Sequence, residues 1–377
     1  MADINQTIMQ VSLLHRSYPI YLGSGLLAHQ ALFEKYIHGH QVLIVTQEKV
    51  AAFCLESLLQ SLQPYHVAVC YLPDGEQYKT VEHWQKIIDQ LIHEKHERST
   101  TLIALGGGVV GDMTGFAAAC YLRGVNYMHV PTTLMAQVDS AIGGKTGLNH
   151  PLGKNLIGAF YQPICVIADF ATLTTLPQRE FIAGMAEVVK YALIQDASFF
   201  QWLEENAEVV LQRDASAVAY MVHQCAAIKA SIIMQDERDQ NVRQLLNFGH
   251  TVGHALEAAF DYHTLVHGEA VAVGMIVAAE LSHALGWIEL TQVNRIRGLI
   301  QRIGLPITIP SSLSNEVVMQ LLRRDKKIQN NKINFVLLES VGRAVMTSNV
   351  SDEQLCGVLN RLRPAVCPRD RGQQTNY

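Results

Sequence analysis

The feature that most constrains the fold is a change of pattern near residue 176. Before it, short β-rich runs alternate with longer stretches of helical period, and this alternation is typical of a parallel sheet with crossover helices. After Leu176-Pro177, the period stays near 3.6 apart from one candidate strand at 335–338. Strands are expected at 41–46, 66–72, 101–105, 127–130 and 165–169, and helices at 49–62, 80–94, 179–194, 216–236, 245–260 and 269–285.

This pattern predicts an α/β fold in two domains. The chain has 377 residues, of which 49% are hydrophobic, and this is more than one core usually contains. We expect a parallel-sheet domain over 1–176 and a helical domain over 177–366. The tail over 367–377 has almost nothing to bury and is expected to be loose.

The charge and cysteine patterns exclude several classes of protein. The net charge is -5, and the absence of a Lys or Arg run argues against a nucleic-acid partner. The longest apolar run, 270–279, is far shorter than the ~20 residues that span a bilayer. The first residues do not resemble a secretory signal. Seven scattered cysteines without CxxC spacing indicate reduced thiols, so we expect a cytoplasmic protein with no membrane partner.

A glycine-rich loop follows the expected strand at 101–105. Gly106 to Asp112 reads GGGVVGD and precedes an apolar helix, so the backbone could approach a pyrophosphate at a helix N-terminus. Asp74 to Lys79 (DGEQYK) follows the strand at 66–72, at the same carboxyl edge of the sheet. Two features depart from the ordinary dinucleotide-binding fingerprint. The loop follows a late strand, and no acidic residue that could bind a ribose lies about 20 positions further on. A tight turn that only serves packing is the alternative, but two such loops favour a nucleotide site.

Lysines set among glycines and hydroxyls form a second motif. Asp139 and Ser140 lead to Gly143-Gly144-Lys145, and Gly153-Lys154-Asn155 follows. An anionic oxygen ligand needs a backbone that approaches closely and an ammonium group. The alternative is a set of solvated loop lysines, which the density of polar groups makes less attractive.

Three segments supply candidate metal ligands. Glu187 lies on an apolar helix with Lys190 one turn later, His250 and His254 have i, i+4 spacing, and His267 opens the longest apolar helix. Two histidines and a glutamate with an open position are a recurring zinc arrangement. Hydrogen-bonded core histidines are the alternative, and spacing does not decide between His250 and His254.

Taken together, these segments resemble the 3-dehydroquinate synthase family over roughly residues 40 to 340. The motifs GGGVVGDMTGF, AACYLRGV, HVPTTLMAQVDSAIGGKTGLN, GKNLIGAFYQP, GMAEVVKYALI, LNFGHTVGHALE and HGEAVAVGM occur in the family's order. The resemblance implies a Rossmann-like N-terminal domain and an all-helical C-terminal domain, with the active site in the cleft between them. It also implies NAD, zinc or cobalt, and a homodimer.

The resemblance assigns roles residue by residue. The metal ligands would be Glu187, His250 and His267, with His254 left to contact substrate or handle a proton. Asp139 would lie near the reacting hydroxyls, and Arg123 would reach the neighbouring subunit's phosphate site. The substrate phosphate and carboxylate would be bound by Lys145, Asn155, Lys190, Lys229, Arg243, Asn247 and Lys326, the last favoured over Lys327. The NAD contacts would be Asp74, Gly75, Glu76, Gln77, Tyr78, Lys79, Gly107, Gly108, Val109, Val110, Gly111, Asp112, Thr132, Thr133, Lys145, Lys154, Thr172, Leu173, Thr174 and Thr175.

The implied reaction converts 3-deoxy-D-arabino-heptulosonate 7-phosphate to 3-dehydroquinate in the shikimate pathway. It combines transient oxidation by NAD, phosphate elimination, reduction and an intramolecular aldol closure. The alternatives are another sugar-phosphate cyclase, a metal-dependent polyol dehydrogenase that releases NADH, and a non-enzymatic metal-binding or regulatory protein. Arg243 to Asn247 with Lys229 favours the dehydroquinate type, and the lysine-rich loop argues against a dehydrogenase.

Overall fold

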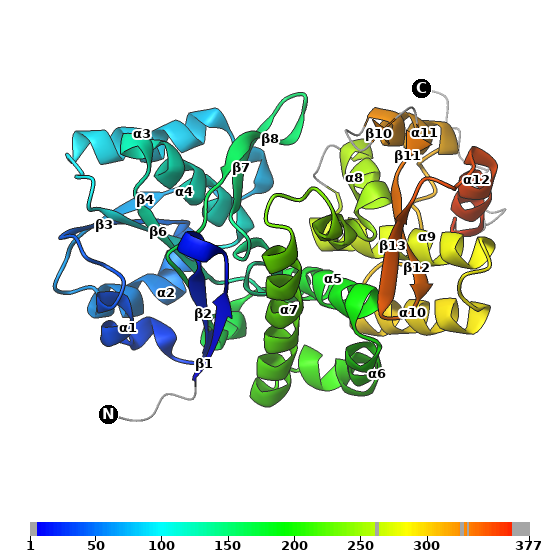
Figure 1. Cartoon of the computed structure of the whole chain (residues 1–377), viewed down its shortest axis with the longest axis horizontal. Coiled ribbons are helices and arrows are strands. Elements are labelled where there is room, and N and C mark those ends of the chain that lie inside the picture. The colour runs from blue at the N-terminus through cyan, green and yellow to red at the C-terminus, as the bar shows by residue number, and fades with distance from the viewer. Residues whose placement is uncertain (1–5, 261–263, 325–327, 330–331, 364–377) are drawn as a thin grey trace, which may run out of the picture. The chain divides into compact units, whose positions relative to one another are not determined.

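The computed structural model describes residues 6–260, 264–324, 328–329 and 332–363. Packing divides the chain into two compact units (Figure 1). Unit 1 contains residues 1–191 and 208–243, and unit 2 contains residues 192–207 and 244–377. The predicted domain boundary near residue 176 rests on sequence pattern and stays a prediction.

Unit 1 is built on a seven-stranded sheet. In spatial order the strands are β1 (Gln6–Val11), β2 (Tyr18–Gly23), β9 (Cys165–Asp169), β6 (Asn126–Pro131), β5 (Thr101–Gly106), β3 (Gln41–Thr46) and β4 (His66–Tyr71). All neighbours pair in parallel except β1 and β2, which are antiparallel. The predicted Rossmann-like sheet is confirmed, and β1 and β2 were not predicted.

Helices cover both faces of this sheet because its central strands are apolar on both sides. Val42 and Ile44 of β3 pack in one core with α1 (Gln30–Glu34) and α2 (Glu48–Ser61). Leu43 and Val45 pack in a second core with α3 (Val81–His93) and α4 (Gly108–Cys120). Alternate side chains of one strand therefore fill two cores.

The remainder of unit 1 includes a hairpin and a long apolar helix. The hairpin joins β7 (Lys145–His150) to β8 (Gly153–Phe160), and β7 packs along α4 (Figure 1). Among the described residues, one helix is long and apolar enough to cross a membrane, α7 (Ala215–Gln235). Because 61% of its apolar stretch is buried inside the protein, α7 is a core helix.

Two further helices, α5 (Gln178–Gln195) and α6 (Ala197–Leu211), contribute residues to both units. Unit 2 otherwise comprises α8 (His250–Ala259), α9 (His267–Ala284), α10 (Leu290–Ile303), α11 (Asn315–Arg324), α12 (Asp352–Arg361), β10 (Ile328–Gln329), β11 (Lys332–Ile333), β12 (Phe335–Ser340) and β13 (Arg343–Thr347). The helical C-terminal part is confirmed, but it also contains short strands. The strand predicted at 335–338 is β12, paired with β13.

One predicted helix has a different start. The pattern predicted a helix over 245–260, whereas a short 3₁₀ helix, η7 (Val242–Asn247), precedes α8. Gly249 separates them with φ +78°, a left-handed conformation that favours glycine. The turn sets His250 at the first position of α8.

Candidate active site

The candidate cofactor residues lie at one edge of the unit 1 sheet. Residues 74–79 follow β4, 107–112 follow β5, 132–133 follow β6 and 172–175 follow β9. These strands are parallel, so the four segments meet at their common carboxyl ends, where ligands of such sheets bind.

A buried lysine joins two of these segments to the hairpin. The Lys79 ammonium donates to Asp112 Oδ2 at 2.6 Å and to Asn155 Oδ1 at 2.7 Å. Burial alone would lower the pKa of Lys79, but Asp112 and Glu76 raise it above its ordinary value. Lys79 therefore stays charged and holds Asn155 beside the glycine-rich loop.

The glycine-rich loop leaves little room for side chains. A Cβ on Gly107 would lie 3.2 Å from Thr133 Cγ2, and a Cβ on Gly108 would lie 3.0 Å from Ser140 Oγ. Ser140 Oγ is buried and has no hydrogen-bond partner in the described part of the chain. The loop thus lies against the unsatisfied Ser140 hydroxyl, next to the N-terminus of α4. Gly111 packs closely on the His129 ring, since a Cβ there would lie 2.6 Å from His129 Cε1, and its contact with NAD stays a prediction.

Several other cofactor candidates are either core residues or hydrogen-bonded to nearby backbone. Val110 and Leu173 are core residues, and Thr132 donates its backbone N–H to the Gly106 carbonyl at 3.1 Å. The threonine hydroxyls at 172, 174 and 175 donate to nearby carbonyls in the short helix η6 (Phe170–Thr175). Their contacts to NAD stay predictions.

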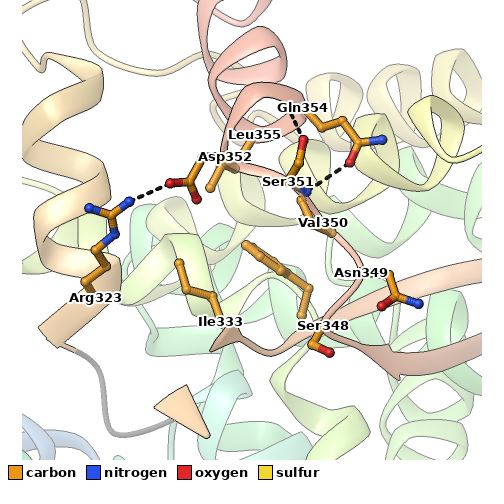
Figure 2. Close-up of a pocket in the computed structure, with 10 residues that line it drawn as sticks. Arg323, Ile333, Ser348, Asn349, Val350, Ser351, Asp352, Gln354 and Leu355 are labelled. Atoms are coloured by element: carbon orange, nitrogen blue, oxygen red, sulfur yellow. Dashed lines mark hydrogen bonds and ion pairs between the residues drawn. The ribbon is translucent and has the colours of Figure 1, made fainter. Parts of the chain in front are cut away.

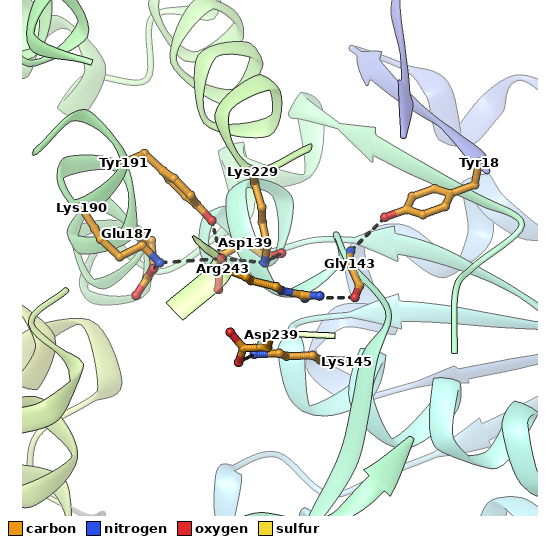
Figure 3. Close-up of polar contacts among 10 residues, drawn as sticks. All are labelled: Tyr18, Asp139, Gly143, Lys145, Glu187, Lys190, Tyr191, Lys229, Asp239 and Arg243. Atoms are coloured by element: carbon orange, nitrogen blue, oxygen red, sulfur yellow. Dashed lines mark hydrogen bonds and ion pairs between the residues drawn. The ribbon is translucent and has the colours of Figure 1, made fainter. Parts of the chain in front are cut away.

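Three predicted substrate cations are buried in unit 1 (Figure 3). Lys190 of α5, Lys229 of α7 and Arg243 of η7 are each at most 5% exposed. We call them the cation cluster. Their helices are distant in sequence, so only the fold brings them to one place.

Asp139 is the counter-ion of this cluster. Its carboxylate accepts from Lys229 Nζ at 2.7 Å and from the Tyr191 hydroxyl, and Lys190 Nζ lies 3.8 Å away. Burial would raise the pKa of Asp139, but Lys190 and Lys229 hold it well below its usual range. Asp139 is therefore an ionised acceptor.

The cluster is still cationic. Together with the neighbouring Lys145–Asp239 pair, four cations face three carboxylates, which leaves one positive charge in excess. Burial lowers the pKa of Lys229 to about 8, with Arg243 adding to this effect. Arg243 Nε is buried without a hydrogen-bond partner among the described residues. A positive site with an unused donor suits an anionic ligand.

The remaining substrate candidates are more exposed than the cation cluster or lie in unit 2. Lys145 is half-exposed and pairs with Asp239, whose φ of +60° is unusual for a non-glycine residue. Arg123 is exposed at the end of a short 3₁₀ helix, with φ +65°. Asn247, in unit 2, donates its side-chain amide to the Gln244 carbonyl at 3.0 Å.

Unit 2 brings three candidate histidines together. The His250 and His254 rings of α8 lie 5.2 Å and 6.0 Å from the His267 ring, measured between centroids. Ligand atoms of His254, Glu257 and His267 all lie within 4.8 Å of one another. Glu257, which the sequence did not predict, is buried with Oε1 3.3 Å from His267 Nδ1. The choice between His250 and His254 stays open.

Glu187, the candidate ligand on α5, is buried in unit 1. Its carboxylate accepts from the Lys190 ammonium, one turn later on the same helix. Removing either partner of such a buried pair would leave a polar group without its contact.

Unit 2 also has a surface cavity (Figure 2). It has a volume of about 730 Å³ and is lined by α11, β12 and the turn before α12. Arg323 and Asp352 pair across it at 2.5 Å. None of the described candidate residues lines it.

Comparison with known proteins places the chain in a family. The N-terminal model of 3-dehydroquinate synthase matches residues 69–183, and the C-terminal model matches residues 184–328. A curated 3-dehydroquinate synthase from Nitrosococcus oceani is 50% identical over 353 residues, which cover 94% of this chain and 98% of that protein. The chain belongs to the 3-dehydroquinate synthase family.

Other relatives agree with this membership. The chloroplastic 3-dehydroquinate synthase of Arabidopsis thaliana is 46% identical, over 94% of this chain and 81% of that protein. The structure of 2-epi-5-epi-valiolone synthase from Streptomyces hygroscopicus, with NAD+ and Zn2+ bound, has a TM-score of 0.86 at 26% identity, covering 93% of this chain and 98% of that one. A 2-deoxy-scyllo-inosose synthase complexed with carbaglucose-6-phosphate, NAD+ and Co2+ has a TM-score of 0.85 at 26% identity, covering 94% of this chain and all of that one.

The sequence did not predict several residues that contact the candidate site residues. Tyr191 and Asp239 bind predicted residues, and Gln137 donates to carbonyls of Pro131 and Asp169 at the ends of β6 and β9. Gln137 and Tyr191 lie inside quoted motifs, so their positions carried a signal. Lys326, its alternative Lys327 and the tail over 367–377 lie outside the described residues.

Proposed function

We propose that this chain is a 3-dehydroquinate synthase. It converts 3-deoxy-D-arabino-heptulosonate 7-phosphate into 3-dehydroquinate and phosphate, a redox-neutral reaction in the shikimate pathway. The observation that carries the proposal is the buried cation cluster of Lys190, Lys229 and Arg243, in the unit that holds the nucleotide loops. A substrate with a phosphate and a carboxylate needs such a site.

The residues present fit NAD and a divalent metal. Because the glycines of the β5–α4 turn carry no side chains, space remains beside Thr133 and Ser140 for a bound group. The N-terminus of α4 can stabilise an anion there. The clustered histidines of unit 2 and the Glu187 carboxylate are donors of the kinds that zinc or cobalt accepts. When bound, NAD accepts and returns a hydride, and the metal polarises a substrate oxygen.

Each charged residue then has a role in binding. Lys190, Lys229 and Arg243 bind the anionic groups of the substrate. Lys145 adds a further charge, and Asn155 and Asn247 add hydrogen bonds to the same substrate. Asp139 is held ionised by Lys190 and Lys229, so it orients a substrate hydroxyl by accepting its hydrogen bond. Fixed charges that orient the substrate also favour the later ring closure.

The proposed metal ligands are Glu187, His250 and His267, with His254 contacting the substrate. This choice rests on the match to the family's motifs. Alanine at any one of the three ligands should lower bound zinc, measured by mass spectrometry, without unfolding the protein. Zinc retained in His250→Ala but lost in His254→Ala would reverse the choice.

The proposed assembly is a cytoplasmic homodimer with Arg123 reaching the partner's site. Support comes from the exposure of Arg123 and from its place in the family motif AACYLRGV. Mixed subunits of inactive Arg123→Ala and inactive Lys145→Ala should regain partial activity. Heterodimers without activity would contradict a shared site.

The decisive experiment supplies the heptulosonate phosphate with NAD and zinc and measures phosphate and NADH together. Phosphate should be released continuously with no net accumulation of NADH, because the hydride returns to the substrate. Continuous NADH formation would favour a polyol dehydrogenase. Failure to release phosphate from this substrate would favour another sugar-phosphate cyclase. Arg243→Ala is the matched variant, expected to lower turnover of the same substrate.

A further inference from the structure

Tyr18 connects the N-terminal part of unit 1 to the cation cluster (Figure 3). It begins β2, has no exposed surface, and lies outside the residues matched by either family model. Its hydroxyl oxygen accepts a hydrogen bond from the Gly143 N–H at 2.9 Å. A tyrosine hydroxyl buried in an apolar core needs such a partner, and here the contact also fixes the Gly143 backbone.

Gly143 in turn holds Arg243. The Gly143 carbonyl accepts from Arg243 Nη2 at 3.0 Å. Gly143 has φ +103°, and a Cβ there would lie 2.5 Å from both Arg243 Nη2 and Ile233 Cδ1. The close approach of the guanidinium therefore requires glycine, and the flexibility of glycine makes an external anchor useful. Tyr18 is that anchor.

The opposite side of the guanidinium is also fixed by backbone. Arg243 Nη1 donates to the Glu237 carbonyl at 2.5 Å. The Glu237 carboxylate accepts from Arg16 at 2.7 Å and from Gln162 at 2.9 Å, so the loop that carries this carbonyl is tied down. Two carbonyls thus orient Arg243 without neutralising its charge, and Nε is left for another acceptor.

We infer that Tyr18 is a positioning residue that fixes Gly143, so that the Gly143 carbonyl aims Arg243 at the anionic substrate. The inference rests on the proposed function, because it takes Arg243 as a substrate contact. Tyr18 itself touches no reacting atom. Burial raises the pKa of Tyr18 far above its ordinary value, so its phenol stays neutral and its effect should not vary between about pH 6 and pH 9.

The test compares Tyr18→Phe with wild type in the holoenzyme, supplied with NAD and zinc. Phe fills the same space but leaves the Gly143 N–H without its acceptor. We expect KM for the heptulosonate phosphate to rise about tenfold, with kcat and the KM for NAD changed less than about twofold, because a binding contact is lost equally from ground and transition states. Tyr65→Phe is the matched control, since the Tyr65 hydroxyl donates to the Ile37 carbonyl at 3.3 Å, and it should keep both constants.

A double-mutant cycle separates positioning from packing. Lysine at 243 keeps a charge but lacks the fork that reaches both carbonyls. Tyr18→Phe should therefore raise KM no further in an Arg243→Lys background. An equal rise in both backgrounds, or no rise in wild type, would overturn the inference. If Arg243→Lys itself leaves KM and kcat unchanged, the assignment of Arg243 under the proposed function fails instead.

Folding is checked by the thermal midpoint, which should fall by a few degrees at most. If Tyr18→Phe does not fold, Gly143→Ala disturbs the same contact from the other side, and a rise in KM above tenfold is expected. An unchanged KM in a folded Gly143→Ala protein would refute the inference. The pH profile adds a second readout, since the ratio of KM values between Tyr18→Phe and wild type should stay constant from pH 6 to 9.

Discussion

Replacing Lys229 by methionine should remove a pH-dependent part of the free energy of unfolding. Lys229 is 5% exposed, and burial lowers its pKa to about 8, whereas an unfolded lysine titrates near 10.4. Above pH 8 the folded protein releases this proton while the unfolded chain keeps it, so the unfolded state binds more protons. Stability therefore rises with pH in this window.

The size of the effect follows from the two pKa values. The slope approaches ~1.4 kcal/mol per pH unit between about pH 8 and pH 10. Between pH 7 and pH 9, wild type should gain about 1 kcal/mol relative to Lys229→Met. The comparison with the variant is essential, because buried thiols such as Cys54 have pKa values raised by burial and give the opposite trend near pH 9.

The assay is urea denaturation at each pH in the presence of a chelator. Trp84 lies in unit 1 with Lys229, so replacing Trp202 and Trp287 by Phe makes fluorescence report that unit. Lys49→Met is the control, because the Lys49 side chain is 80% exposed and its loss should leave the pH dependence of wild type. Identical pH dependence in Lys229→Met and wild type would refute the account of the buried lysine.

Three further changes test other parts of the structure. Glu257→Gln should weaken zinc binding about 10- to 100-fold in chelator competition, because a carboxylate that hydrogen-bonds a ligating histidine orients it; unchanged affinity would exclude this role. Gly249→Ala should lower the free energy of unfolding by at least ~1–2 kcal/mol, since φ is +78° and a Cβ would lie 2.6 Å from Met275 Cγ. A thermal midpoint equal to that of wild type would contradict the tight packing of α8 on α9. Asp236→Asn should cost about 1–3 kcal/mol in denaturation, because the Asp236 carboxylate accepts three backbone N–H groups, including that of Arg243; a neutral effect would mean that the amide replaces all three contacts.

The sequence predicted the central strands of unit 1 because buried parallel strands are continuous apolar runs. The predicted strand at 41–46 coincides with β3, and every predicted strand of the first half has its counterpart in the sheet. β1 was missed because most of its residues are exposed and polar residues flank Ile8 and Met9. An edge strand needs apolar residues on one face at most, so it leaves a weak signal.

The cation cluster could not be derived from spacing. Lys190, Lys229 and Arg243 are separated by 39 and 14 positions, and no local period relates them. They were named through resemblance to a family, and the structure then placed Lys190 and Lys229 at the Asp139 carboxylate, with Arg243 in the same buried cluster. Tyr18 precedes every motif and reads as an ordinary strand residue, and so its contact with Gly143 required the fold.

The lysines of unit 1 fall into two energetic kinds, and this difference bears on how the substrate enters. Lys229 and Asp139 are mostly buried, and separating such a pair costs about 3–5 kcal/mol because each charge would be left without solvent. In the Lys145–Asp239 pair the side chains are 50% and 23% exposed, so the pair is better solvated than Lys229–Asp139 and lies nearer to surface pairs, which contribute about 0–1 kcal/mol. A substrate anion can therefore replace Asp239 as the partner of Lys145 at a small cost in free energy. The Lys229–Asp139 ion pair, by contrast, stays formed. We expect the substrate to enter beside an intact Lys229–Asp139 pair and to exchange only the exposed contact.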